Sequence, residues 1–221
     1  MKYLLFGDSI AWGMNDFKNR GWQGHLKKHI HKKIREELRD GKTFVRLKYY
    51  FSIKKKKSFF INFAFPGDNS LDLLYKLNNK GRKIIENSPE EGFTVIIAIG
   101  ANDSQIGKSK IKKSIEKKEF RDNILKILRL SKKLARRVIV IGLLPVDEKK
   151  IVNTKMKKHY FNKRIEEYNR ILKECSQKEN VFFKDFYNNW IKKDFKKFLS
   201  DGLHPNKEGH ELIFEELKSL F

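Results

Sequence analysis

The sequence predicts an α/β protein in which helices cover a parallel β-sheet. Apolar runs of strand length alternate with amphipathic stretches of helix length along the chain, and this alternation is typical of consecutive βαβ units. The stretch FTVIIAI at Phe93–Ile99 is a nearly continuous apolar run, as expected for a strand buried on both faces of a parallel sheet. No Gly/Ser-rich linker and no internal repeat divides the 221 residues, so we expect a single domain over residues 1–221.

The first half of the chain contains three expected strands and two expected helices. An apolar run at Tyr3–Phe6 predicts the first strand. A helix follows, because apolar residues recur at every fourth position: Leu26, Ile30, Ile34 and Leu38. β-branched and aromatic residues then predict strands over Thr43–Ile53 and Phe59–Phe63, around a lysine run at 54–57. The next helix is expected over Ser70–Ile85.

The second half continues the same alternation after the strand at Phe93–Ile99. A helical stripe is formed by Phe120, Ile124, Ile127, Leu128 and Leu134. A strand at Val138–Ile141, a helix at Phe161–Cys175 and a short strand at Val181–Phe183 follow. The last helix is predicted by Leu212, Ile213, Leu217 and Leu220.

The composition indicates a folded chain with a large positive charge. Hydrophobic residues make up 39% of the sequence, which is enough apolar mass for a core. Lys and Arg outnumber Asp and Glu by 50 to 27, which gives a net charge of +23. Such an excess is compatible with a non-catalytic module that binds nucleic acid or anionic lipid. Because the lysines are spread along the whole chain, however, we expect no specific nucleic-acid partner.

The cysteine content and the N-terminal residues indicate the cellular compartment to expect for this protein. The single Cys175 excludes an internal disulfide and favours a reducing cytoplasm. Its place on an apolar helical stripe predicts a buried structural thiol. Met1 leads almost directly into a strand-like run without a cleavage site, so we expect no secretory signal. No apolar run reaches the ~18 residues of a membrane span, and no transmembrane segment is expected.

Four polar clusters follow the expected strands or precede the last helix. GDS at residues 7–9 follows the first strand, and NFAFPGDN at 62–69 includes the end of the second strand region. GAND at 100–103 follows Phe93–Ile99, and DGLHPN at 201–206 precedes the last helix. Because ligands of open parallel sheets bind beyond the carboxyl ends of the strands, we expect these clusters to converge at one edge.

The residue types in these clusters fit acyl transfer. A serine hydroxyl such as that of Ser9 needs a base, and Asp201 and His204 are close enough in sequence for one turn to hold carboxylate against imidazole. A tetrahedral oxyanion also needs fixed donors. The backbone N–H of Gly67, the side-chain amide of Asn102 and the N–H of Ser9 are the candidates.

The four stretches FGDSIAWG, NFAFPGDNS, IGANDS and DGLHPN resemble, in order and spacing, the signature blocks of the SGNH (GDSL-type) hydrolase family. The resemblance implies a flavodoxin-like, three-layer α/β/α sandwich with a parallel sheet of about five strands. It implies Ser9 as nucleophile, His204 as base and Asp201 as its partner. The implied oxyanion hole consists of Ser9, Gly67 and Asn102.

The resulting expectation is a serine esterase that works through an acyl-enzyme, without a metal or cofactor. Its partner would be a small-molecule ester, which the net charge of +23 allows to be anionic. A thioester or a carbohydrate O-acetyl group is the alternative substrate. Two features depart from the family pattern. Pro66 precedes Gly67, and the basic region at 43–63 is longer than a minimal member needs.

Three other motifs suggest alternative functions, but each lacks a residue that the alternative function requires. Residues 102–109 end in GKS after a buried strand, but Asn102 stands where a P-loop needs glycine. GDSIA lacks the second glycine of the GxSxG nucleophile elbow. His25, His29 and His31 have no acid or cysteine near them in sequence that would complete a metal site, so we expect them on a solvated helix face. Asp8 is expected to form the turn that holds Ser9.

Overall fold

A computed structural model describes residues 2–39, 60–88, 92–106, 115–152 and 159–221. Within these residues, five parallel strands form one sheet in the order β2-β1-β3-β4-β5. The strands are β1 (Lys2–Gly7), β2 (Phe60–Asn62), β3 (Phe93–Ala98), β4 (Arg137–Ile141) and β5 (Phe182–Lys184). This is the strand order of flavodoxin-like folds, and it confirms the predicted fold class.

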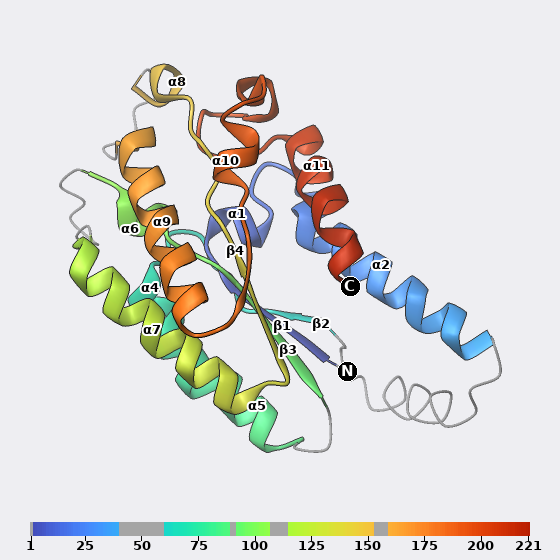
Figure 1. Ribbon diagram of the computed structural model, residues 1–221. Coiled ribbons are helices and arrows are strands. Elements are labelled where there is room, and N and C mark those ends of the chain that lie inside the picture. Colours follow the sequence, from blue (N-terminus) through green and yellow to red (C-terminus); the bar gives the residue numbers. More distant parts are fainter. Residues whose placement is uncertain (1, 40–59, 89–91, 107–114, 153–158) are drawn as a thin grey trace.

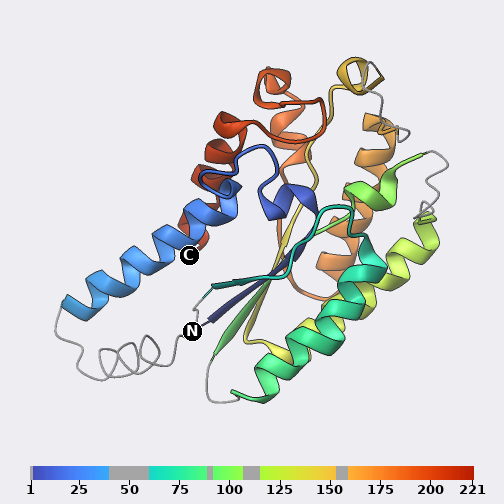
Figure 2. The same cartoon turned by 180° about the vertical axis from the view of Figure 1, so that it is seen from behind.

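Helices cover both faces of the sheet (Figures 1 and 2). One face carries α2 (Gly21–Arg39) and α11 (Lys207–Leu217). The other face carries α4 (Ser70–Lys76), α5 (Arg82–Glu86), α7 (Lys117–Leu134) and α9 (Asn162–Lys178). The described residues also form short α-helices: α1 (Ser9–Trp12), α6 (Ala101–Ser104), α8 (Glu148–Val152) and α10 (Tyr187–Trp190).

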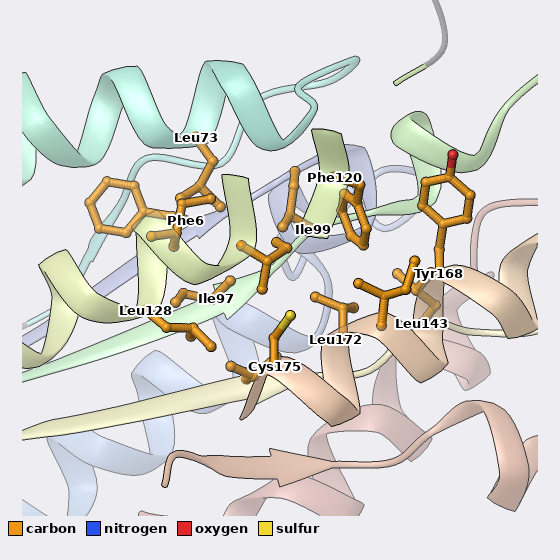
Figure 3. Packing of buried hydrophobic residues seen from close by; sticks show 14 of the residues in the cluster. Phe6, Leu73, Ile97, Ile99, Phe120, Leu128, Leu143, Tyr168, Leu172 and Cys175 are labelled. Carbon is orange, nitrogen blue, oxygen red and sulfur yellow. The ribbon is translucent and has the colours of Figure 1, made fainter. Parts of the chain in front are cut away.

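The apolar strands divide their side chains between two cores, because successive side chains of a strand point to opposite faces. In β3, Val95 and Ile97 pack toward α7 and α9, whereas Ile96 packs toward α2 and α11. The strand β1 does the same with Leu4 and Leu5. Figure 3 shows the first of these cores, where side chains of β1, β3, α4, α7 and α9 interlock.

Most predicted elements agree with the structure, with shifts of a few residues at their ends. The helix expected over Ser70–Ile85 is present, but its middle, Leu77–Gly81, is a π-helical segment (η1) between α4 and α5. A 3-10 turn, η2 (Phe195–Phe198), precedes the loop before α11, and another, η3 (Lys218–Leu220), follows that helix. Cys175 is buried, as predicted. The strand expected over 43–53, the lysine run at 54–57 and the GKS letters at 107–109 lie outside the described residues.

No helix in the described part of the chain is long and apolar enough to cross a membrane. The carboxyl ends of β1 and β3 lie side by side, since Gly7 pairs with Ala98. The polar clusters at 7–9 and 100–103 therefore emerge next to each other. This places the expected site at the predicted edge of the sheet.

Candidate active site

Ser9 begins the short helix α1, directly after the first strand. The Asp8 carboxylate accepts a hydrogen bond from the N–H of Ile10 at 2.9 Å and so caps this helix. This confirms the turn-forming role expected for Asp8. Gly7 is required because a Cβ there would lie 2.5 Å from both the Ala11 Cβ and the Ala98 carbonyl oxygen. Because Gly7 has no side chain, α1 can pack closely against the end of β3, and Ser9 at the start of α1 is held in place.

His204 is held by a tight turn that Asp201 organises. One carboxylate oxygen of Asp201 accepts from the N–H of Leu203 at 3.0 Å and from the N–H of His204 at 2.8 Å. Asn206 then caps α11 by accepting from the Gly209 N–H at 2.8 Å. Residues 201–206 (DGLHPN) thus form a turn that leads directly into α11. The turn places the imidazole of His204 within hydrogen-bonding distance of Ser9.

The Ser9, His204 and Asp201 side chains form one hydrogen-bonded chain. The Ser9 Oγ lies 2.8 Å from His204 Nε2, and His204 Nδ1 lies 2.7 Å from Asp201 Oδ2. An ionised carboxylate only accepts hydrogen bonds, so Nδ1 carries the imidazole proton and Nε2 accepts from the serine hydroxyl. The structure therefore brings together three predicted site residues from opposite ends of the chain.

Asp201 is ionised in this arrangement. Partial burial alone would raise the pKa of its carboxyl group. Hydrogen bonds from the His204 side chain and backbone, together with the charge of His204, outweigh burial and hold that pKa below its ordinary value. The carboxylate can therefore stabilise a positive charge on the imidazole at neutral pH.

Gly67 lies in a turn that also explains the unusual Pro66. The N–H of Asp68 donates to the carbonyl of Phe65 at 3.1 Å, and Gly67 has a φ of 84°. Proline at the second position and a positive φ at the third define a type II turn. A Cβ on Gly67 would meet nothing within 4 Å. Glycine is therefore required there by backbone conformation and not by crowding.

Asn102 joins the third polar cluster to the second. Its Nδ2 donates to the carbonyl of Asp68 at 2.9 Å, so the amide lies against the turn that contains Gly67. Its Oδ1 accepts from the hydroxyl of Tyr160 at 3.1 Å. The side chain is 7% exposed, which leaves it little room to reorient.

A second buried network braces the same two loops. The Asp103 carboxylate accepts from the N–H of Ser70 at 3.0 and 3.1 Å, and Asn123 donates to the Ser70 hydroxyl at 3.0 Å. Burial raises the pKa of Asp103 to about 7. Burial likewise raises the pKa of Asp8 to about 6. Asp8 and Asp103, which adjoin Ser9 and Asn102 in the sequence, are therefore buried carboxyl groups whose pKa values are raised toward neutral pH.

The histidines of α2 are less exposed than predicted. The rings of His25 and His29 pack against Phe214 of α11, with ring centroids 5.6 and 5.8 Å apart. The expected solvated face is thus only partly present, because the helix packs on a neighbour that sequence periodicity alone did not reveal. Among the described residues, no group of three or more His, Cys, Asp or Glu side chains is arranged to hold a metal ion.

The sequence as a whole can now be compared with known proteins. The family model described as GDSL-like Lipase/Acylhydrolase matches residues 3–217. The chain belongs to the GDSL-like lipase/acylhydrolase family. The chain is 26% identical over 230 aligned positions to the human protein named isoamyl acetate-hydrolyzing esterase 1 homolog. That alignment covers 98% of this chain and 79% of the human protein.

Solved structures share the fold of this GDSL-like acylhydrolase. The lipase/acylhydrolase from Enterococcus faecalis superposes with a TM-score of 0.63 at 23% identity, covering 100% of this chain and 97% of that one. The acetylxylan esterase Axe2 from Geobacillus stearothermophilus gives 0.64 at 16% identity, covering 98% and 91%. The family and its esterase relatives make the chain an ester hydrolase, which excludes the alternative of a non-catalytic basic module.

Sequence reasoning missed three residues that support the site of this acylhydrolase. Tyr160 contacts Asn102, Asp103 binds the Ser70 N–H, and His210 holds the loop after Ser9. The His210 Nε2 donates to the Met14 carbonyl at 2.8 Å, and its Nδ1 accepts from the Trp22 N–H at 3.3 Å. Of these three residues, only Asp103 could have been recognised from the sequence, because it adjoins Asn102 in the GAND motif.

Proposed function

We propose that this ester hydrolase uses Ser9 as nucleophile, His204 as general base and Asp201 as the partner of His204. The single observation that carries the proposal is the continuous chain of hydrogen bonds from the Ser9 hydroxyl through the imidazole to the Asp201 carboxylate. A serine hydroxyl is a weak nucleophile unless an adjacent base takes its proton. In this chain Nε2 of His204 is within hydrogen-bonding reach of that proton.

The reaction then follows from the positions of the protons. The Ser9 oxygen attacks the ester carbonyl carbon while Nε2 of His204 takes the hydroxyl proton. The tetrahedral intermediate collapses when His204 returns that proton to the leaving alcohol oxygen, which gives an acyl-enzyme. Water attacks the acyl-enzyme with His204 again as base, and Ser9 regains its proton. Asp201 remains ionised and stabilises the imidazolium of His204 during both acylation and deacylation.

The oxyanion hole of this proposal consists of the N–H groups of Ser9 and Gly67 and the amide of Asn102. One of the two N–H bonds of Asn102 Nδ2 binds the Asp68 carbonyl, and the second is assigned to the oxyanion. Support comes from the contact between Asn102 and the turn that contains Gly67. Donors that are fixed before the reaction stabilise developing charge without reorganisation.

The substrate of the proposal is a small ester with an apolar portion. Trp12 and Phe65 are large side chains that are 38% and 60% exposed. Trp12 ends α1, the helix that begins with Ser9, and Phe65 begins the turn that contains Gly67. An exposed aromatic beside the site favours contact with an apolar group of the substrate. The names of the human relative and of the acetylxylan esterase Axe2 concern acetate esters, which supports a short acyl chain.

Hydrolysis of nitrophenyl esters with acyl chains from acetyl to palmitoyl tests the proposed substrate class. We expect kcat/KM to be highest for the shortest chains and to be lost in Ser9→Ala. A carbohydrate O-acetyl ester is the second candidate, because the structural neighbour Axe2 is an acetylxylan esterase. Acetate release from acetylated xylo-oligosaccharides at a higher kcat/KM than from nitrophenyl acetate would favour it. A maximum at palmitoyl would contradict both.

A further inference from the structure

The side chain of Asn102 is held at both ends of its amide group. Its nitrogen donates to the Asp68 carbonyl at 2.9 Å, and its oxygen accepts from the Tyr160 hydroxyl at 3.1 Å. Tyr160 lies 58 positions further along the chain and is 3% exposed. The mechanism above assigns no role to this tyrosine.

These two contacts determine which way the amide points. A carbonyl oxygen only accepts hydrogen bonds, so the atom of Asn102 that faces Asp68 is the nitrogen. The other amide atom is then the oxygen, which accepts from the Tyr160 hydroxyl at 3.1 Å; the second acceptor near this hydroxyl, Gln105 Oε1, is more distant at 3.5 Å. Because the amide group is planar, contacts at both of its ends fix its plane. The second N–H bond of Asn102 Nδ2 can then point in only one direction.

We propose that Tyr160 is a positioning residue that holds the Asn102 amide in the orientation needed for oxyanion binding. The proposal rests on the proposed function, since it assumes that Asn102 donates to the oxyanion. Tyr160 acts through Asn102 and touches no reacting atom. Without its hydroxyl the amide oxygen loses its buried partner, and the amide is free to rotate about its last side-chain bond.

The tyrosine is itself anchored close to the site. The segment before it pairs with the segment after Asn102, because His159 and Ile106 each donate a backbone N–H to the other's carbonyl at 2.8 Å. Burial, followed by the negative charges of Asp8 and Asp201, raises the pKa of Tyr160 above its ordinary value. The hydroxyl therefore keeps its proton and remains a donor over the whole working range of pH.

The variant Tyr160→Phe removes this one hydroxyl, and Tyr187→Phe is its matched control. The Tyr187 side chain is 4% exposed, and its hydroxyl donates to the Asn162 carbonyl at 3.2 Å, away from Asn102. We expect Tyr160→Phe to lower kcat by about 3- to 10-fold, as the loss of one neutral hydrogen bond implies, with KM unchanged. Tyr187→Phe should retain the wild-type kcat. Equal kcat values for the two variants would overturn the proposal.

Combining the change with Asn102→Ala separates positioning from general structural support. Where Asn102 is already absent, Tyr160→Phe should cause no further loss of kcat. The same 3- to 10-fold loss in that background would overturn the positioning role and leave the proposed function intact. If Asn102→Ala alone retains the wild-type kcat, the proposed oxyanion hole is wrong and the positioning role is overturned with it.

A measurement on the wild-type protein decides the matter if Tyr160→Phe does not fold. The two side-chain N–H signals of Asn102 are identified in a ¹⁵N-labelled sample by their loss in Asn102→Ala. An alkyl boronic acid that forms a tetrahedral adduct with Ser9 is then added. We expect one N–H signal to shift and the signal of the N–H bound to Asp68 to stay. Equal shifts of both signals would overturn the fixed orientation.

Discussion

The Ser9 hydroxyl lies 2.8 Å from Nε2 of His204, although 195 positions separate the two residues in the sequence. The strand β1 carries Ser9 to the carboxyl edge of the sheet, and the turn before α11 brings His204 to the same edge. The Asp8 cap of α1 and the Asp201 turn fix the two side chains independently. Each end of the chain therefore has a local structural reason to place its side chain there.

Replacement of Asn102 by Ala tests the oxyanion hole. Because the amide donates most strongly when negative charge develops on the carbonyl oxygen, we expect kcat to fall by about 10²–10³-fold, or ~2.7–4 kcal/mol, with little change in KM. Steady-state kinetics with nitrophenyl acetate measure both parameters. A rise in KM at constant kcat would make Asn102 a contact of the bound ester and not of the transition state.

Replacement of Asp201 by Asn tests the partner of His204. An amide cannot balance the imidazolium charge, and its N–H favours the wrong tautomer of the imidazole, so kcat should fall by about 10⁴-fold. The turn should persist, since the amide oxygen can still accept from the backbone N–H groups of Leu203 and His204. Kinetics together with circular dichroism check this. Retention of more than a tenth of the wild-type kcat would show that the carboxylate is dispensable.

Replacement of Asp103 by Asn should stabilise the protein at alkaline pH. The folded-state pKa of Asp103 is raised to about 7 from 3.8, so the folded state binds this proton more tightly than the unfolded state. Its contribution to stability is therefore complete below about pH 4 and is lost as the pH rises through 7. The amide of Asn still accepts from the Ser70 N–H and cannot ionise.

Urea unfolding of both proteins from pH 4 to 8 measures this effect. The free energy of unfolding of Asp103→Asn should exceed that of the wild type at pH 8 by an amount on the order of 4 kcal/mol, because the pKa rises from 3.8 to about 7. The difference should shrink toward pH 4. A constant difference across this range would mean that Asp103 does not titrate between these limits. The partially exposed pair Arg121 and Glu174 offers a control in Glu174→Gln, whose effect should be small at every pH.

The net charge of +23 predicts a different salt response for anionic and neutral esters. A positive potential over the site would attract an anionic ester, and added salt would screen that attraction. We expect salt to lower kcat/KM several-fold for an anionic ester and to leave a neutral ester of equal chain length unaffected. Equal responses would assign the lysines to solubility alone. Asp8 and Asp201 near the site should moderate the effect.

The strands and the polar clusters were predictable because each depends on local sequence. A strand buried on both faces of a parallel sheet is almost continuously apolar, as Phe93–Ile99 is apart from Thr94. The clusters follow strand ends, and parallel strands bring those ends to one edge. The Asp201–His204 contact was predictable because three positions fit one turn.

The supporting residues Tyr160 and His210 were not predictable, because their contacts depend on tertiary packing. Tyr160 meets Asn102 only after the loop before α9 folds back against the loop after α6. The π-helical segment Leu77–Gly81 lies within the stretch Ser70–Ile85, which the sequence predicts as one ordinary helix. In the folded chain Gly81 packs against Phe6, where a Cβ would lie 2.8 Å from its ring. Such close approaches leave no trace in periodicity.

Labelling with a fluorophosphonate probe tests the central assignment most directly. The probe phosphonylates a serine whose hydroxyl is activated by an adjacent base, and mass spectrometry of the digested protein locates the adduct. We predict one adduct, on Ser9 in wild-type protein, with no labelling in Ser9→Ala and strongly slowed labelling in His204→Ala. Both variants should retain the wild-type circular dichroism spectrum. An adduct on any other serine, or undiminished labelling of Ser9→Ala, would contradict the assignment of Ser9 as the nucleophile.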